Sequence, residues 1–135
     1  MNYPRSGKFL LITLLLLLLP SSQLFAQEDL VVSAAEAKDF IGQIAMVCGV
    51  VVDTHYAQTS SGRPTYINFE EPYPNALFTA VIWEKDRENF HFNPSSLLGL
   101  DLCVYGQITR YKSKPQMKLV RPEQLSRRPN QHTTS

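Results

Sequence analysis

Positively charged side chains gather in one short stretch near the end of the chain. The segment GQITRYKSKPQMKLV, residues 106–120, holds Arg110, Lys112, Lys114 and Lys118 and no acidic residue. Arg110, Lys112 and Lys114 stand at alternate positions, so in an extended strand they project to one side. Such a row of cations can follow a phosphate backbone. Cations at a hairpin can also simply be solvated, or can protect an exposed sheet edge from aggregation.

The net charge of the whole chain does not indicate a type of binding partner, but the charges are unevenly distributed along the sequence. Seven of the 13 basic residues follow Gly106. Of the 12 acidic residues of the chain, only Glu123 follows that position. Such a separation of charge is typical of a protein with an anionic partner, which would be a nucleic acid or an acidic protein.

Catalytic chemistry finds little support in the sequence. His55, His91 and His132 are scattered without the spacing of metal ligands. No nucleophile elbow, Gly-rich phosphate loop or His-Glu helix motif is present. The acidic clusters at residues 70–71 and 84–88 lie in loop-like sequence, and the second contains Lys85 and Arg87. We therefore expect no enzyme activity, no cofactor and no metal site.

The first 26 residues have the pattern of a secretory signal peptide. A basic start is followed by an apolar run of 11 residues, Phe9 to Leu19, and by a small residue, Ala26, at the expected cut. A bilayer-spanning helix needs roughly 20 apolar residues. No cysteine lies near the cut to accept a lipid. We expect a periplasmic or secreted protein with no membrane span after cleavage, and a mature chain of one domain.

An N-terminal extension, residues 27–43, is expected to carry one short helix. Ser33 and Glu36 have the spacing of a capping box, which predicts a helix over about residues 34–41. Gly42 suits the end of that helix, because glycine adopts the left-handed conformation without a steric penalty.

The remainder of the chain alternates between strand-like and turn-like sequence. The β-branched run from Ile44 to Tyr56 is broken only by Gly49, which in a strand is typical of a bulge or bend. A helical connection, broken around Pro94, is expected between the third and fourth strands, and residues 126–135 are expected to form a disordered tail. The five predicted strands cover residues 44–56, 65–70, 77–83, 100–111 and 115–122.

This plan resembles a known family. The stretches VCGVVVDT, YINFEEPYPNALFTAVIW and LLGLDLCVYGQITRYKSKPQMKLVRPEQL are similar to OB-fold nucleic-acid-binding modules of small exported bacterial proteins, over about residues 44–125. The resemblance implies a mostly β fold, a five-stranded Greek-key OB-fold barrel, with the short N-terminal helix outside it. It further implies that single strands bind across strands two and three, between the first and last loops. The first loop is longer than a tight turn and is expected to extend over that face.

Strand alternation then assigns side chains to the implied binding face. If Ile67 and Phe69 point inward, Tyr66 and Asn68 point outward. Leu102, Val104 and Ile108 share the inward parity of strand four, which leaves Tyr105 outward. Tyr111 stands between the cations of the last hairpin, and Trp83 ends strand three. Tyr66 and Tyr111 can stack on bases or serve as ordinary surface packing, whereas packing is the expected role of Trp83. The predicted nucleic-acid contacts are Tyr66, Asn68, Arg110, Tyr111, Lys112, Lys114 and Lys118.

The same parity places both cysteines on outward positions. Cys48 and Cys103 lie in strands one and four, which are antiparallel neighbours in the OB fold. An oxidising compartment would join two such residues in a disulfide. The alternative is that both are small buried residues covered by the N-terminal helix.

Two functions remain after this reading. The first is a non-catalytic nucleic-acid-binding module that binds single strands and is weakly sequence-specific. The second is an exported barrel that binds a protein or a small ligand in the cell envelope. The compartment favours the second, and the basic hairpin favours the first.

Overall fold

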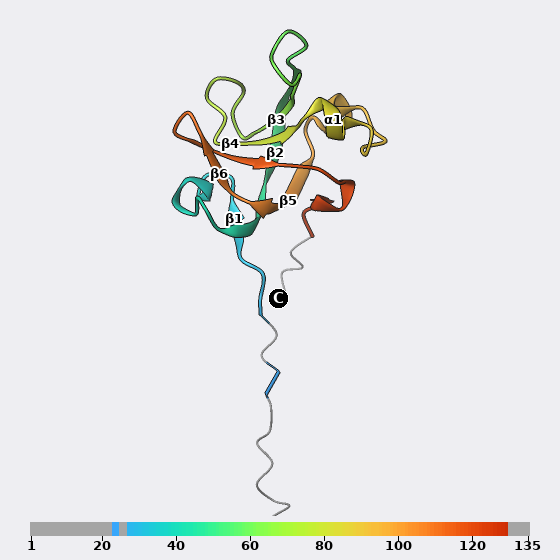
Figure 1. The fold of residues 1–135 in the computed structure, drawn as a ribbon. Coiled ribbons are helices and arrows are strands. Elements are labelled where there is room, and N and C mark those ends of the chain that lie inside the picture. The colour runs from blue at the N-terminus through green and yellow to red at the C-terminus, as the bar shows by residue number, and fades with distance from the viewer. Residues whose placement is uncertain (1–22, 25–26, 130–135) are drawn as a thin grey trace, which may run out of the picture.

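The computed structural model describes residues 23–24 and 27–129. The predicted signal peptide, apart from residues 23–24, and the predicted tail from residue 130 on lie outside the described residues. Within the described part the chain is mostly β, with eight strands in one sheet and only short helical turns (Figure 1). The strands are β1 (Val31–Ser33), β2 (Ile44–Tyr56), β3 (Thr65–Phe69), β4 (Phe78–Ile82), β5 (Asp101–Gln107), β6 (Thr109–Tyr111), β7 (Lys114–Lys118) and β8 (Leu125–Arg127).

The strands pair in the order β6-β7-β4-β3-β2-β5-β8, and β1 joins β2. Two pairs, β1–β2 and β4–β7, are parallel, and the other pairs are antiparallel. This order describes an open sheet. The mostly β class predicted from the sequence is confirmed. The predicted first strand has the bounds observed for β2, and the connection between β4 and β5 holds α1 (Glu84–Arg87) and η3 (Pro94–Leu97).

The core lies on one side of the sheet, as the alternation of apolar residues predicted. Ile67 and Phe69 of β3 are fully buried, and so are Val104 of β5 and Ile108. These residues pack with alternate residues of β2, β4 and β7, because residues two apart in a strand point to the same side. The opposite side of each strand is therefore left for other contacts.

The long strand β2 bends where a carboxylate approaches it. The pairing of β2 with β3 is irregular between Val51 and Asp53. Just before this bulge the Val50 N–H donates to Oε1 of Glu70 at 2.9 Å. A Cβ on Gly49 would lie 2.7 Å from the same oxygen. Gly49 thus leaves room for the carboxylate, which agrees with its predicted place beside a bend.

The predicted N-terminal helix is shorter than expected. The capping box is present, because Glu36 accepts from both the N–H and the hydroxyl of Ser33, and its own N–H donates to that hydroxyl. Gly42 has φ 93°, as predicted for the end of the segment. Between them, however, only the 3₁₀ turn η2 (Ala37–Asp39) forms. A segment of this length is marginal as an α-helix, because nucleation is costly and few intrahelical hydrogen bonds follow it.

Two strands at the ends of the domain were not predicted. β1 pairs with β2 at the start of the described chain. At the other end Ser126 and Arg127 continue β8 against β5, and Arg128 forms a 3.0 Å ion pair with Asp101. The prediction that these residues belong to a disordered tail was therefore wrong. The short 3₁₀ turn η4 (Pro122–Gln124) leads into β8.

The predicted disulfide is confirmed. Cys48 of β2 and Cys103 of β5 are paired residues with Cα atoms 4.0 Å apart, and their sulfurs are bonded. Neither belongs to the apolar core cluster, so both lie on the outward parity that was assigned to them. They are nevertheless buried, beneath a surface that includes β1 and the residues after β8. In the part of the chain that the structure describes, no helical segment has the length and apolar character of a membrane span.

Candidate nucleic-acid interface

The candidate site is the side of β2, β3, β4, β7 and β6 that faces away from the core, here called the outer face. Paired residues of neighbouring strands point to the same side of a sheet. One row of paired residues crosses all five strands, and a second row crosses four of them. The first row is Asp53, Asn68, Thr79, Gln116 and Thr109, and the second is His55, Tyr66, Val81 and Lys118.

Asn68 lies on the predicted face but does not serve as an exposed contact. Its side chain is only 3% exposed. The amide nitrogen donates to Oδ2 of Asp53 at 3.0 Å, and the amide oxygen accepts from the Thr79 hydroxyl at 2.8 Å. Asn68 therefore links β2, β3 and β4 beneath the surface. The prediction of direct nucleic-acid contact by Asn68 fails, because a polar group between two strands is most stable when its hydrogen bonds are made internally.

Tyr66 on the outer face lies within electrostatic range of two other tyrosines, Tyr111 and Tyr73. Burial raises the pKa of Tyr66 above its usual value near 10, and the neighbouring Tyr111 and Tyr73 act in the same direction while Lys112 opposes them. Tyr111 is 53% exposed and Tyr73 80% exposed. The Lys112 ammonium lies 5.5 Å from the centre of the Tyr111 ring. Two predicted contacts, Tyr66 and Tyr111, are thus brought together with a cation.

The cations of the β6–β7 hairpin do not form the single row that alternation predicted. Tyr111 pairs with Lys114, and Arg110 pairs with Pro115. Consecutive pairs face opposite sides, so Arg110 points away from the side that carries Tyr111 and Lys114. Lys112 lies in the turn with φ 46°, outside any strand. The prediction of one row was wrong because extended geometry ends at Tyr111.

Lys118 lies at the end of β7, two strands away from Tyr66. It pairs with Val81, which in turn pairs with Tyr66, so Lys118 belongs to the second row of the outer face. Its side chain is exposed. Lys112 is therefore the cation that acts on Tyr66, and Lys118 is an exposed cation of the same row of paired residues.

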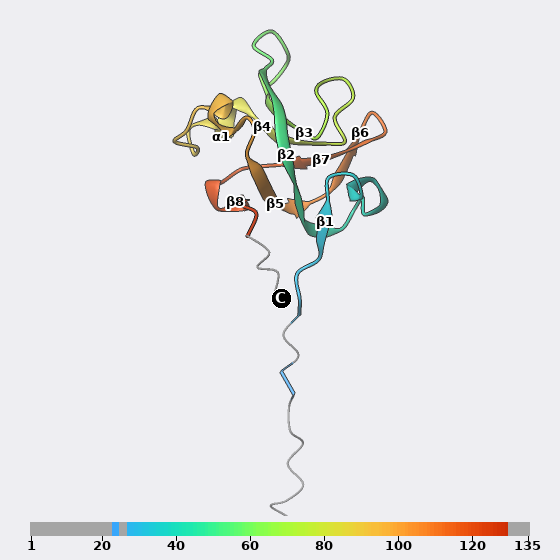
Figure 2. The same ribbon diagram turned by 180° about the vertical axis from the view of Figure 1, so that it is seen from behind.

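The β3–β4 connection, residues 70–77, adds residues that the sequence reading missed. The Tyr73 N–H donates to Oδ2 of Asp53 at 3.2 Å, and Nζ of Lys114 donates to the Pro74 carbonyl oxygen. In Figures 1 and 2 this connection lies beside the β6–β7 hairpin. Asp53 and His55 could have been found from the alternation of β2, whereas Tyr73 stands in a turn that has no such periodicity.

The β2–β3 connection, residues 57–64, does not extend over the tyrosines as expected. The Glu84 N–H donates to the Gly62 carbonyl at 3.3 Å, and a Cβ on Gly62 would lie 2.9 Å from the Trp83 ring. The loop therefore packs at the start of α1. Trp83 has the packing role that was expected of it.

A polar hollow of about 380 Å³ lies between the end of β2 and the segment from α1 to η3. His55, Tyr56, Glu84 and Arg87 are among its lining residues. The Arg87 guanidinium donates to the carbonyls of Phe90 and Phe92 at 2.8 and 2.6 Å. Burial, followed by a hydrogen bond to Glu84, raises the pKa of Tyr56. Within residues 23–24 and 27–129 no group of three or more His, Cys, Asp or Glu side chains has the arrangement of a metal site.

Comparisons with known proteins add little to this geometry. No protein-family model matches the sequence, and no curated protein matches it. Among solved structures, the chain is similar to a Leishmania major Friedlin protein assigned as an aspartyl-tRNA synthetase, with a TM-score of 0.46 and 8% sequence identity. The likeness covers 79% of this chain but 22% of that one. At this score and identity it assigns no function to the chain.

Proposed function

We propose that this chain is an exported, non-catalytic OB-fold module that binds single-stranded nucleic acid with little sequence preference. The observation that carries the proposal is the outer face, where Tyr66 and Tyr111 lie near the Lys112 ammonium and Lys118 belongs to the same row of paired residues as Tyr66. Aromatic rings stack on bases of any sequence, and cations follow the phosphates.

The strand pairing supports an OB barrel. β5 ends at Gln107 and β6 begins at Thr109, so the two can be counted as one strand interrupted at Ile108. Counted in this way, β2 pairs with β3, β3 with β4, β4 with β7, β7 with β6, and β5 returns to β2. If β5 and β6 act as one strand, these pairings join five strands in a circuit, and this supports the proposed OB barrel.

The disulfide supports export. Cystine bonds persist in oxidising compartments and are rare in the cytosol. Together with the predicted signal peptide, the bond between Cys48 and Cys103 favours a periplasmic or secreted protein.

The test measures the affinity of the full-length protein for a fluorescein-labelled oligothymidylate of about 12 nucleotides by fluorescence anisotropy. The logarithm of the affinity should fall linearly with the logarithm of the salt concentration, by about 0.7 for each phosphate contact. Changing Lys112→Ala and Lys118→Ala together should flatten the slope by roughly 1.4. The matched control changes Lys38→Ala and Lys85→Ala, two exposed lysines of η2 and α1 that belong to none of the five strands of the outer face.

Two results would contradict the proposal. One is the absence of binding by the wild type at low salt. The other is an equal loss of slope in the control, which would indicate attraction by overall charge alone.

A second candidate function is supported by the hollow beside His55, whose volume of about 380 Å³ falls in the range of small-ligand sites. In this case the barrel would bind a small ligand or a protein in the cell envelope.

An acidic protein partner is tested with a polyglutamate peptide. Binding of that peptide with the same salt dependence, and without dependence on Tyr66 or Tyr111, would favour the protein partner over a nucleic acid.

A further inference from the structure

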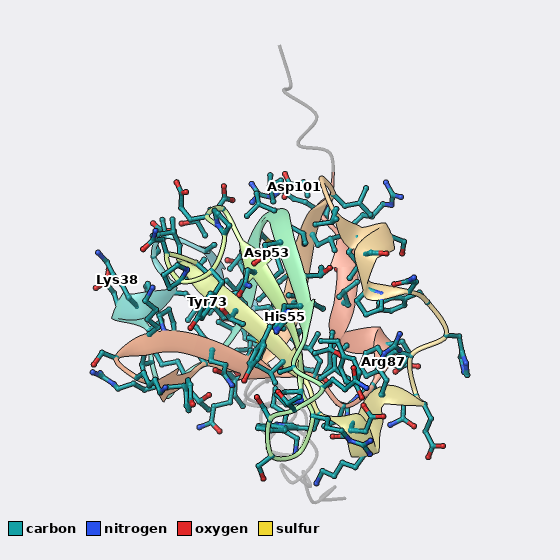
Figure 3. The ribbon with its side chains drawn as sticks, turned by 90° about the horizontal axis from the view of Figure 1, so that it is seen from above. Lys38, Asp53, His55, Tyr73, Arg87 and Asp101 are labelled. Carbon is teal, nitrogen blue, oxygen red and sulfur yellow. A yellow bond between two sulfur atoms is a disulfide. The ribbon has the colours of Figure 1, made fainter. Side chains whose placement is uncertain are left out.

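One carboxylate stands within the outer face, where it would repel the phosphates of a bound strand. Asp53 lies in the first row, on the same strand as His55 and close to Tyr73 (Figure 3). Its Oδ2 atom accepts two hydrogen bonds, from Nδ2 of Asn68 at 3.0 Å and from the N–H of Tyr73 at 3.2 Å. The contacts of Asp53 indicate a structural role that would offset this repulsion.

The β3–β4 connection is held from both sides of the outer face. Asp53 of β2 binds the N–H of Tyr73, and Lys114 of β7 binds the carbonyl of Pro74. In the sheet, β2 and β7 flank the pair formed by β3 and β4. Two charged side chains from opposite flanks thus bond consecutive residues of one loop, and the backbone beneath Tyr73 is fixed relative to the strands.

The Tyr73 side chain itself is left free. It is 80% exposed, the highest value among the exposed tyrosines of the described chain. It lies near enough to Tyr66 to influence that hydroxyl, as Tyr111 also does. A large ring whose backbone is held by charged hydrogen bonds, but whose faces are open, is ready to receive a flat apolar ligand at low entropic cost.

We infer that Tyr73 is a third stacking residue of the nucleic-acid face, and that Asp53 is the residue that positions it. The inference rests on the proposed function and assigns a role to a loop outside the first and last loops of the fold. It accounts for an acid on a basic face, because Asp53 acts on the loop and contacts no base.

The first arm of the experiment removes the ring. Anisotropy with the same labelled oligothymidylate compares the full-length wild type with Tyr73→Ala. Stacking of one base corresponds to a loss of affinity of roughly 5- to 150-fold, with no change in salt slope because no counterion is released. Tyr73→Phe should bind as the wild type does, since stacking uses the ring. Tyr105→Ala, an exposed tyrosine on β5, is the matched control and should change nothing.

The second arm tests the positioning role of Asp53. A role through charge and a role through positioning predict opposite changes in affinity when Asp53 is replaced by Ala. If Asp53 acted only through its charge, Asp53→Ala would tighten binding. If Asp53 positions Tyr73, Asp53→Ala weakens binding. The same substitution should cause little further loss of affinity in a protein that already carries Tyr73→Ala. Asp53→Asn keeps an oxygen that can accept from the Tyr73 N–H and should restore part of the affinity. Circular dichroism at the assay temperature checks that the Asp53 variants are folded, and Tyr73→Ala removes only an exposed side chain.

The outcomes separate the inference from the proposed function. A wild type that binds no oligonucleotide at low salt overturns both. A wild type that binds, with Tyr73→Ala binding equally well, overturns the third stacking residue and leaves the proposed function in place. Tighter binding by folded Asp53→Ala overturns the positioning role of Asp53.

Discussion

Reduction of the disulfide between Cys48 and Cys103 should destabilise this protein by several kcal/mol. The two cysteines are 55 residues apart in the sequence. Closing a loop of that length removes on the order of 14 cal/mol/K of entropy from the unfolded chain, which corresponds to about 4 kcal/mol at 25 °C. Both residues lie outside the apolar core cluster, so their replacement leaves its packing intact. The predicted loss therefore comes from the unfolded state.

Urea unfolding followed by the fluorescence of Trp83, the single tryptophan, measures this loss. The oxidised protein is compared with protein held in reductant and with a Cys48→Ala, Cys103→Ala variant. The latter two should agree, at about 4 kcal/mol below the oxidised form. Their unfolding should also depend more steeply on urea, because an uncrosslinked chain exposes more surface.

The thermal midpoint should fall on the order of 15–30 °C with the disulfide reduced. The double alanine variant is the control, because its stability should not respond to reductant. A loss below about 1 kcal/mol on reduction would refute the loop-closure reasoning. Equal masses before and after reduction would show that the bond is absent from the purified protein.

Two further substitutions test contacts within the described chain. Asn68→Ala removes the partner of both Asp53 and the Thr79 hydroxyl and should lower the free energy of unfolding by about 1–3 kcal/mol, measured by urea unfolding, whereas the exposed Lys118→Ala should change it by less than about 0.5 kcal/mol. Hydrogen bonds from the N–H and hydroxyl of Ser33 hold the pKa of Glu36 below its usual value of 4.5. Because that pKa is depressed, its contribution is present above pH 4.5 and is lost as the pH falls through the folded value. Glu36→Gln should therefore melt below the wild type at pH 7, and the difference should shrink toward pH 3; a constant difference would contradict this account.

The amino-acid sequence by itself determined the elements that depend on neighbouring residues. The β-branched run from Ile44 to Tyr56 and the alternation around Ile67 and Val104 are local patterns, so they predicted strands and their buried sides. The same parity, with the strand order implied by the resemblance, placed Cys48 opposite Cys103. Tyr66 was assigned to the outer face for the same reason.

Only the tertiary structure decided which of these side chains are free to act. Asn68 is on the predicted face, but its side chain is hydrogen-bonded to Asp53 and Thr79, which belong to other strands. Arg110 points away from Lys114 because a turn interrupts the alternation. Tyr73 joins the site through bonds between its loop and two strands that flank it. Such contacts link residues far apart in the chain, and a local pattern of hydrophobic and polar residues carries no information about them.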